Sequence, residues 1–308
     1  MNNPEITLDE LTRKDKLYRG LLRFFSRLPL PFLQRFGSAV GWLAARLRGN
    51  SAYHVVHRNL ELCFPEKSPE EIGQLTEANL IATAPVAFEF AKTWGNPTDY
   101  SIGQIRKVHN EEVFFEAINS GRGTIAILPH FGTWEFMNAW TNQHTATTIM
   151  YKPGKDKGVD AFVLEARGRL RATMVPADER GVKGSLKTLK KGGFCAILPD
   201  HVPQDGGGVY APFFGISTYT GVLVPRLTER TGCMVIMMSC IRRPNGDGFE
   251  MYFDRPDPEI YSSDLATSAT AMNRTIEMLI RRSPEHYHWF YKRFKNNETM
   301  LDPYKARK

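Results

Sequence analysis

Short apolar runs alternate with amphipathic stretches over residues 122–283, and this alternation is the main structural signal in the chain. Continuous apolar or strictly alternating runs predict strands at 123–128, 146–151, 194–198, 233–241 and 249–254. Apolar positions at helical spacing predict helices at 133–141, 157–172, 182–191, 220–231 and 264–283. Strands that alternate with helices indicate an α/β fold, with a central, mostly parallel or mixed sheet flanked by helices.

The segment before this region is helical in pattern. Residues 52–66 and 69–95 read as helices, and Ser68 followed by Pro69 is a favourable helix start, with the serine as N-cap. We therefore expect one α/β domain over 51–308, preceded by a separate N-terminal arm over 1–50.

The arm has the pattern of a basic amphipathic helix. On a helical projection of residues 13–28, apolar and basic side chains gather on opposite sides: Leu17, Leu21, Phe24, Phe25 and Leu28 against Lys16, Arg19, Arg23 and Arg27. Prolines 29 and 31 interrupt this helix, and a second segment with Trp42 follows. Its longest uncharged stretch, 36–45, is about 15 Å long as a helix, whereas the hydrocarbon core of a bilayer is about 30 Å thick. The pattern favours a helix that lies in the membrane interface over one that spans it.

Net charge supports the same interpretation. The chain carries a formal charge of +7, and residues 13–48 hold nine Lys or Arg against the single acid Asp15, which leaves 31 basic and 32 acidic residues elsewhere. Such a segment suits the phosphates of anionic lipids. Nucleic acid is a weaker alternative because the basic face lacks interleaved aromatic residues. A third alternative is an ordinary amphipathic helix packed on the domain.

Cysteine usage indicates a reducing compartment. Cys63, Cys195, Cys233 and Cys240 form no CxxC pair, and two of them lie in apolar strand-like runs. The first apolar segment is interrupted by arginines and lacks a cleavage site, so no secretory signal is visible. We expect a protein that faces the cytoplasm.

The sequence HFGTWE, from His130 to Glu135, is the leading candidate for chemistry. It directly follows the apolar run 124–128 and Pro129, and loops after strands carry the functional groups of α/β proteins. An imidazole can take a proton from a hydroxyl at neutral pH, and a neighbouring carboxylate can orient the ring and stabilise its charged form. The alternative is structural: His130 caps the helix that starts near Thr133, and Glu135 complements the helix dipole.

Other polar residues follow strands or end helices in the same region. Arg167, Arg169 and Arg171 lie at a helix end, where alternate positions diverge, so we expect only some of them to face a site. Asp200 and His201 follow the strand 194–198 and open a Gly-rich loop that matches no phosphate-binding fingerprint. A zinc site using His130, Glu135, Asp200 or His201 would lack any recognised ligand spacing.

The absence of a nucleophile motif narrows the reaction. The chain has no GxSxG sequence, and no cysteine adjoins His130, which disfavours a covalent acyl-enzyme. A base, a carboxylate, an arginine and a membrane-seeking arm together suggest acyl transfer to a hydroxyl of an amphiphile by direct attack.

Several segments, taken in order, resemble the late lipid A acyltransferases, the lauroyl/myristoyl transferase family of Gram-negative bacteria. These are HRNLELCFPEKSPEE (57–71), GRGTIAILPHFGTWE (121–135), MYKP (150–153), RGR (167–169), ILPDHVPQDGGGVYAPFFG (197–215), LVPRLTERTGCMVI (223–236) and PEHYHWFYKRFK (284–295). The resemblance covers most of the chain, and its strength lies in the set rather than in any one segment.

The resemblance implies a fold of the glycerol-phosphate-acyltransferase type and a specific reaction. The family transfers a fatty acyl chain from acyl carrier protein to a hydroxyl of a 3-hydroxyacyl chain on a lipid A precursor, at the cytoplasmic face of the inner membrane. His130 would deprotonate the hydroxyl and Glu135 would orient His130. Arg167 would hold the oxyanion or a phosphate, with Asp200 and, on weaker grounds, Arg169 in the same site. No metal or bound cofactor is implied.

Two positions depart from the family pattern and leave the acceptor and the chain length open. His201 stands where many relatives have Gln, and Lys152 stands where many have Arg. Two other functions remain as alternatives: a related acyltransferase for another phospholipid or glycolipid, and a non-catalytic lipid-binding protein of the same fold.

Overall fold

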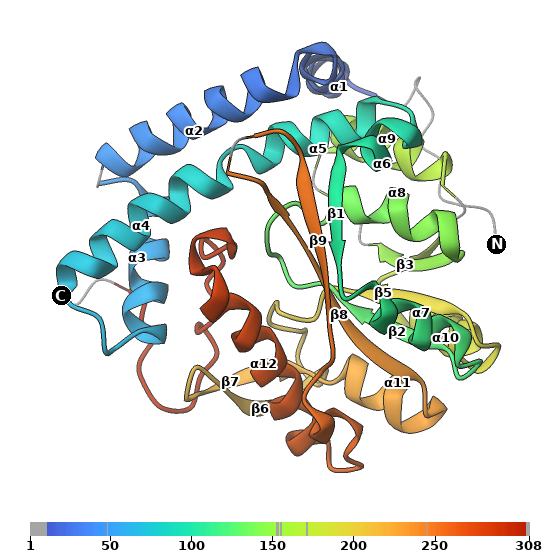
Figure 1. Ribbon diagram of the computed structural model, residues 1–308. Helices are drawn as coiled ribbons and strands as arrows, with labels where there is room; N and C mark the ends of the chain where they lie inside the picture. Colours follow the sequence, from blue (N-terminus) through green and yellow to red (C-terminus); the bar gives the residue numbers. More distant parts are fainter. Residues whose placement is uncertain are drawn as a thin grey trace.

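The computed structural model describes residues 11–47, 49–151, 154, 156–170, 172–244 and 246–305 (Figure 1). Arg48, Lys152, Pro153 and Arg171, which entered the sequence analysis, lie outside the described residues. The α-helices are α1 (Arg13–Arg27), α2 (Leu30–Arg46), α3 (Ser51–Cys63), α4 (Pro69–Thr83), α5 (Val86–Gly95), α6 (Thr98–Gln104), α7 (Glu111–Asn119), α8 (Glu135–His144), α9 (Lys157–Gly168), α10 (Glu179–Lys190), α11 (Leu223–Thr231) and α12 (Leu265–Arg282).

A seven-stranded sheet forms the centre of the molecule, in the order β1-β9-β8-β2-β5-β3-β4. All its pairings are parallel except that of β8 with β9. A separate two-stranded antiparallel sheet joins β6 and β7. The strands are β1 (Ile105–His109), β2 (Thr124–Ile127), β3 (Thr147–Tyr151), β4 (Thr173–Pro176), β5 (Phe194–Ile197), β6 (Gly208–Phe213), β7 (Ile216–Gly221), β8 (Met234–Arg242) and β9 (Phe249–Asp254). The predicted α/β class, with a mostly parallel mixed sheet flanked by helices, is confirmed.

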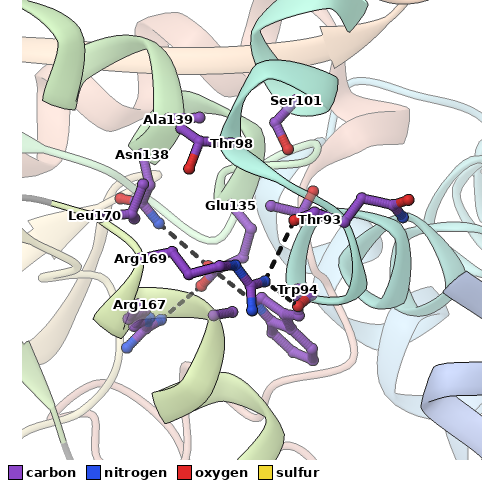
Figure 2. Close-up of a pocket in the computed structure, with 12 residues that line it drawn as sticks. Thr93, Trp94, Thr98, Ser101, Glu135, Asn138, Ala139, Arg167, Arg169 and Leu170 are labelled. Carbon is purple, nitrogen blue, oxygen red and sulfur yellow. Dashed lines mark hydrogen bonds and ion pairs between the residues drawn. The ribbon is translucent and has the colours of Figure 1, made fainter.

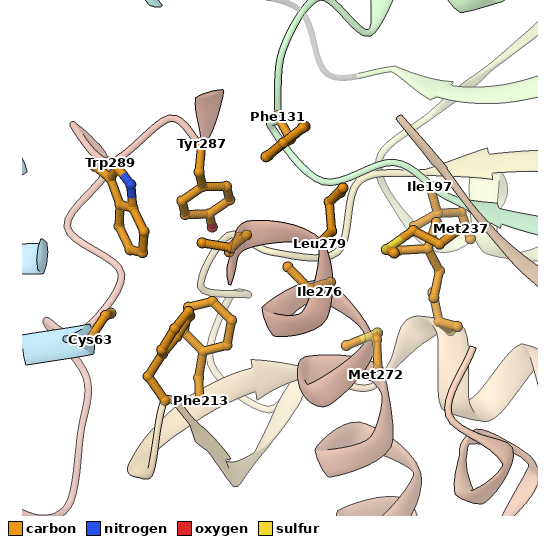
Figure 3. Packing of buried hydrophobic residues seen from close by; sticks show 14 of the residues in the cluster. Cys63, Phe131, Ile197, Phe213, Met237, Met272, Ile276, Leu279, Tyr287 and Trp289 are labelled. Carbon is orange, nitrogen blue, oxygen red and sulfur yellow. The ribbon is translucent and has the colours of Figure 1, made fainter. Parts of the chain in front are cut away.

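Strand β2 shows why the apolar runs fold as they do. All four of its residues are buried, because β5 and β8 pair with its two edges and helices cover both faces of the sheet. Ile125 and Ile127 pack on one face with residues of α3 and α12, whereas Ala126 packs on the other with residues of α7 and α8. Figure 3 shows the first of these clusters, in which Met272, Ile276 and Leu279 of α12 gather with Ile197 of β5 and Met237 of β8.

The sequence missed elements that lack a clear period. β1 has partly exposed positions throughout, β4 has four residues, and β6 and β7 contain exposed positions and pair mainly with each other. The predicted helix 220–231 begins three residues later, because 220 and 221 belong to β7. The predicted helix 69–95 is divided near Pro85 into α4 and α5, and Ser68 caps α4 in a reciprocal capping box with Glu71, as expected.

Helices α1 and α2 pack on α4, α5 and α9 (Figure 1), but the face that α1 turns inward is polar. Asp15 and Ser26 of α1 are buried, and Arg19 and Arg23 form ion pairs with Glu165 of α9. The apolar side chains point outward instead: Leu17 is 59% exposed, Phe24 is 56% exposed and Leu43 of α2 is 53% exposed. Phe25 packs edge to face on Phe88 of α5, but Leu17, Leu21 and Phe24 of the same apolar face are exposed.

Helix α2 approaches α4 and the start of α5 closely through glycines. A Cβ atom on Gly41 would lie 2.2 Å from the carbonyl oxygen of Leu80, and one on Gly37 would lie 2.5 Å from Cα of Pro85. Among the described residues, no helix combines the length and the hydropathy needed to cross a membrane.

Candidate active site

The loop between β2 and α8 holds His130 at the carboxyl end of the sheet. Gly132 has a φ of 57°, and a Cβ there would lie 2.1 Å from the carbonyl oxygen of Cys240, so only glycine fits this turn. The backbone N–H of Thr133 donates to Cys240 O at 2.8 Å, and its hydroxyl donates to the buried carboxylate of Glu89 at 2.5 Å. The backbone N–H of His288 donates to His130 O at 2.9 Å. The loop is thus fixed from both sides.

Asp200 is the hydrogen-bond partner of the His130 imidazole. The two atoms Nδ1 of His130 and Oδ1 of Asp200 lie 2.8 Å apart, and the backbone N–H of His130 donates to Oδ2 at 3.0 Å. Strands β2 and β5 explain the pairing, because Ile127 and Ile197 are in register and each site residue lies three positions further along. A carboxylate only accepts hydrogen bonds, so Nδ1 carries the proton and Nε2 is left as the basic atom.

The environment keeps Asp200 ionised. It is buried, and the hydroxyl of Tyr287 donates to its Oδ2 at 3.1 Å. Burial alone would raise the pKa of Asp200, but the charge of His130 and the hydrogen bonds from it lower that pKa to well below its usual range. The imidazole of His130 is therefore hydrogen-bonded to a carboxylate that is negatively charged at neutral pH.

Aromatic rings hold the other faces of the imidazole. The rings of His130 and His201 are stacked with centroids 3.9 Å apart and an interplanar angle of 1°, and Tyr291 stacks on the far side of His201 at 3.8 Å. Trp134 meets His130 edge to face at 5.1 Å. Burial, followed by the charge of His130, lowers the pKa of His201 to about 4, so this neighbour is neutral at pH 7.

His288 is a third histidine in this group. It packs against the edge of Trp134, and its Nε2 is buried without a hydrogen-bond partner among the described residues. Burial and the charge of His130 lower the pKa of His288 to about 3. At neutral pH both neighbours of His130 are therefore uncharged.

Glu135 has a different set of partners from the one we expected. Figure 2 shows its carboxylate between Arg167, Trp94 and Asn138. Nη2 of Arg167 donates to Oε1 at 2.6 Å, while Trp94 Nε1 and Asn138 Nδ2 donate to Oε2 at 3.0 and 3.1 Å. The expectation that Glu135 orients His130 directly is corrected here, because these donors take its oxygens and Asp200 takes Nδ1.

The two described arginines of this set, Arg167 and Arg169, diverge, as predicted. Arg167 faces Glu135, and its guanidinium lies over the ring of Tyr151 with 5.7 Å to the centroid. Arg169 turns away and donates to the backbone carbonyls of Trp94 and Asn96 at the end of α5 (Figure 2). The structure thus brings Arg167 and Glu135 together and places Arg169 in a structural contact beside them.

Two cavities meet at His130. One, the helical groove, has a volume of about 510 Å³, and the other, the sheet-end cavity, has about 460 Å³. Phe90, His130 and Trp134 line both. The remaining walls of the helical groove are Val40, Gly41, Ala44, Leu80, Thr83, Ala84, Val86, Ala87, His201, His288, Phe290 and Tyr291. The sheet-end cavity is lined further by Trp94, Leu128, Glu135, Asn138, Ile149, Met150, Tyr151, Gly154, Asp160, Val163, Arg167, Ala177, Ala196, Ile197, Leu198 and Leu223.

Sequence reasoning missed the contribution of the C-terminal segment. Tyr287, His288 and Tyr291 follow α12 and lie against the His130 loop, although more than 150 residues separate them in the chain. The aromatic and histidine density of PEHYHWFY was the available signal. Within the described ranges, no three His, Cys, Asp or Glu side chains are grouped so that they could hold a metal ion.

The fold and this arrangement define the class as an α/β protein with an imidazole–carboxylate pair at the carboxyl edge of its sheet. Comparison with known proteins specifies the family. Residues 7–296 match the model of the bacterial lipid A biosynthesis acyltransferases, and the chain belongs to this family.

Individual relatives agree with this assignment. The chain is 30% identical to a lipid A biosynthesis lauroyltransferase of Escherichia coli K12 over 279 residues, which are 90% of this chain and 89% of the relative. It is 26% identical to a lipid A biosynthesis palmitoleoyltransferase of the same organism over the same shares. A lipid A biosynthesis acyltransferase of Haemophilus influenzae is 27% identical over 90% of this chain and 88% of its own length.

Proposed function

We propose that this acyltransferase moves a fatty acyl chain from acyl-acyl carrier protein to the hydroxyl of a 3-hydroxyacyl chain on a lipid A precursor. The observation that carries the proposal is the His130–Asp200 pair at the junction of two cavities. The family membership supports the acceptor, and the relatives named above are lauroyl- and palmitoleoyltransferases of lipid A biosynthesis.

The chemistry follows from the protonation state of the pair. Nε2 of His130 takes the proton from the acceptor hydroxyl as its oxygen attacks the thioester carbonyl carbon. The C–S bond then breaks, and the imidazolium returns the proton to the departing thiolate. The charge of Asp200 stabilises the imidazolium between these two events. No enzyme-bound ester forms, and no bound cofactor takes part.

Arg167 and Glu135 line the sheet-end cavity together with His130 and serve the same step. Arg167 is the cationic side chain in the described lining of this cavity, and it supplies positive charge for the oxyanion of the tetrahedral intermediate or for a phosphate of the acceptor. Glu135 fixes its position through the 2.6 Å ion pair. Glu135 thus contributes to catalysis by orienting the arginine rather than the imidazole.

Membrane binding through α1 and α2 fits this substrate. Their outward apolar residues are flanked by exposed basic residues that include Lys14, Arg27 and Arg35. Such a surface can lie in the interface of an anionic leaflet, with the cations at the phosphates. We place the protein at the cytoplasmic face of the inner membrane, with acyl carrier protein, the lipid A precursor and anionic lipids as its partners and with no role for nucleic acid.

Purified protein tests the proposal in mixed micelles with acyl-acyl carrier protein and a lipid A precursor. We expect the precursor to gain the mass of one acyl chain, and we expect His130→Ala to abolish that gain. Acylation of glycerol phosphate or another glycolipid in place of the precursor would support the related-transferase alternative. Lipid binding without any acyl transfer would support the non-catalytic alternative.

A further inference from the structure

The two cavities that meet at His130 differ in what surrounds them. In the helical groove, polar side chains gather at the His130 end, where His201, His288 and Tyr291 lie. Its far walls are mostly aliphatic and come from α2, α4 and α5; α4 and α5 follow each other end to end, and α2 lies alongside both (Figure 1). The sheet-end cavity carries charge instead, from Glu135, Asp160 and Arg167.

The helical groove also opens on the outward apolar surface. Val40 of α2 is both a wall of the groove and 46% exposed, and Phe290 is a wall that is 50% exposed. Phe36 and Leu43, which flank Val40 at helical spacing, are exposed on the same helix. The groove is therefore continuous with the surface that α1 and α2 present to lipid in the proposed function.

The continuity of the groove with the apolar surface suggests different routes for the lipid acceptor and the acyl donor. A lipid that resides in the bilayer can pass an aliphatic chain along α2 into the groove without exposing it to water. Each methylene that the bound state left exposed to water, instead of burying it in the groove, would cost about fourfold in affinity. A thioester carried by a soluble protein has no such constraint, and the sheet-end cavity presents the charged side chains of Glu135, Asp160 and Arg167 to it.

We propose that the helical groove binds the hydroxyacyl chain of the membrane-resident lipid acceptor, while the sheet-end cavity binds the acyl donor. This assignment rests on the proposed function and adds the separate location of each substrate. The acceptor hydroxyl then reaches Nε2 of His130 from the α2 side, and the thioester carbonyl lies on the side of Arg167.

Three alanines allow the assignment to be tested without disturbing the core. Ala87 lines the helical groove, Ala177 lines the sheet-end cavity, and Ala266 on α12 lines neither. All three are exposed, so a larger side chain is tolerated at each. We expect Ala87→Phe to raise KM for the lipid acceptor by about tenfold or more, with KM for the acyl donor changed by less than about twofold.

The matched variants give the opposite and neutral results. Ala177→Phe should raise KM for the acyl donor and leave KM for the acceptor unchanged. Ala266→Phe should change neither KM. A rise in donor KM alone for Ala87→Phe would reverse the assignment and overturn it. Unchanged KM values for both substrates in Ala87→Phe would show that neither substrate binds in the groove.

A binding readout separates this inference from the proposed function. A lipid A precursor with a diazirine in its hydroxyacyl chain is irradiated with the protein in anionic vesicles, and the labelled peptides are mapped by mass spectrometry. Label on α2 and α5 is expected whether or not turnover occurs. Label on β3 or α9 would overturn the assignment even if acyl transfer is demonstrated, whereas α2 and α5 labelling without transfer would leave it standing and refute only the reaction.

Discussion

Asp200 contacts His130 twice, through ring Nδ1 at 2.8 Å and through the backbone N–H at 3.0 Å. One carboxylate thereby fixes both the rotation of the ring and the position of the loop that carries it. The neighbouring His201 and His288 are neutral at pH 7, so the negative charge of Asp200 is the main electrostatic support for a protonated imidazole.

Removing this charge should impair turnover, and it should also lower the free energy of unfolding, because the pKa of Asp200 is lowered in the folded state. We expect Asp200→Asn to lower kcat by about 10² to 10⁴, because the amide no longer stabilises the imidazolium, and His130→Ala to lower it by at least ~100-fold. The kcat of the double variant should be about the same as that of the less active single variant, since the two residues act as one unit. Steady-state kinetics with acyl-acyl carrier protein gives these values, and Asp205→Asn, in an exposed loop, is the matched control. Near-wild-type kcat for Asp200→Asn would refute the pairing as a catalytic device.

Glu135 and Arg167 should behave as a second unit. Glu135→Ala is expected to lower turnover by at least ~100-fold, because the guanidinium loses the carboxylate that positions it. In a double-mutant cycle of Glu135→Gln with Arg167→Gln, we expect a coupling of more than about 1 kcal/mol in the activation free energy. If the losses in kcat/KM for this pair are additive and Glu135 is instead strongly coupled to His130, the result would support the direct action of Glu135 on His130 that the sequence suggested.

The histidines around the site make folding stability depend on pH. The pKa values of His201 and His288 are about 4 and about 3 in the folded state, and an unfolded histidine titrates near 6.5. Between these values the unfolded chain binds more protons, so the free energy of unfolding falls as pH decreases from about 6.5 towards 4. Below that window the loss continues as Asp200, whose pKa is lowered by folding, becomes protonated.

Thermal unfolding measured from pH 7.5 to 4.5 checks this prediction. We expect Tm to be nearly constant above about pH 6.5 and to fall below it. The double variant His201→Gln, His288→Gln should flatten the fall, whereas His54→Gln, at an exposed position, is the matched control. A Tm that is flat down to pH 4.5 in the wild type would contradict the buried neutral state of the two rings.

The outward faces of α1 and α2 predict the effect of added charge on membrane binding. Phe24→Glu combined with Leu43→Glu should weaken binding to anionic vesicles, because each buried apolar side chain contributes about 1.5–3 kcal/mol. Vesicle sedimentation measures the bound fraction. Met278→Glu, an exposed apolar position on α12, should have no effect. Unchanged sedimentation of the double variant would show that this surface does not meet lipid.

Ionic strength should affect the binding of the acyl donor. Acyl carrier proteins are acidic as a class, and exposed lysines such as Lys183 and Lys187 lie on α10, which starts just after Ala177 of the sheet-end cavity. We expect KM for acyl-acyl carrier protein to rise with ionic strength and with the double variant Lys183→Glu, Lys187→Glu. Lys107→Glu on β1 is the control. A donor KM that is flat across salt concentrations would argue against electrostatic docking.

Much of the fold could be predicted from the sequence, because buried parallel strands are continuous apolar runs and the helices have clear periods. The positions of His130 and Asp200 after strands were also predictable. Their pairing was not, since it depends on β2 and β5 being neighbours in register, and strand order is not written in local spacing. Because Glu135 is close to His130 in the sequence, it was predicted as the partner of the imidazole in place of Asp200. Likewise, the pattern of α1 showed an amphipathic helix but not that its polar face turns inward, which depends on Glu165 of α9.

Helix α9 has contacts with both ends of the proposed machinery. Glu165 forms ion pairs with Arg19 and Arg23 of α1, and Arg167, two residues further on, forms an ion pair with Glu135. A single helix therefore links the position of Arg167 and Glu135 in the site to the position of α1 on the surface. On the proposed membrane orientation, we expect a hydroxyl at a different depth along the lipid tail to miss the imidazole, so that this spacing selects the position on the acceptor that is acylated.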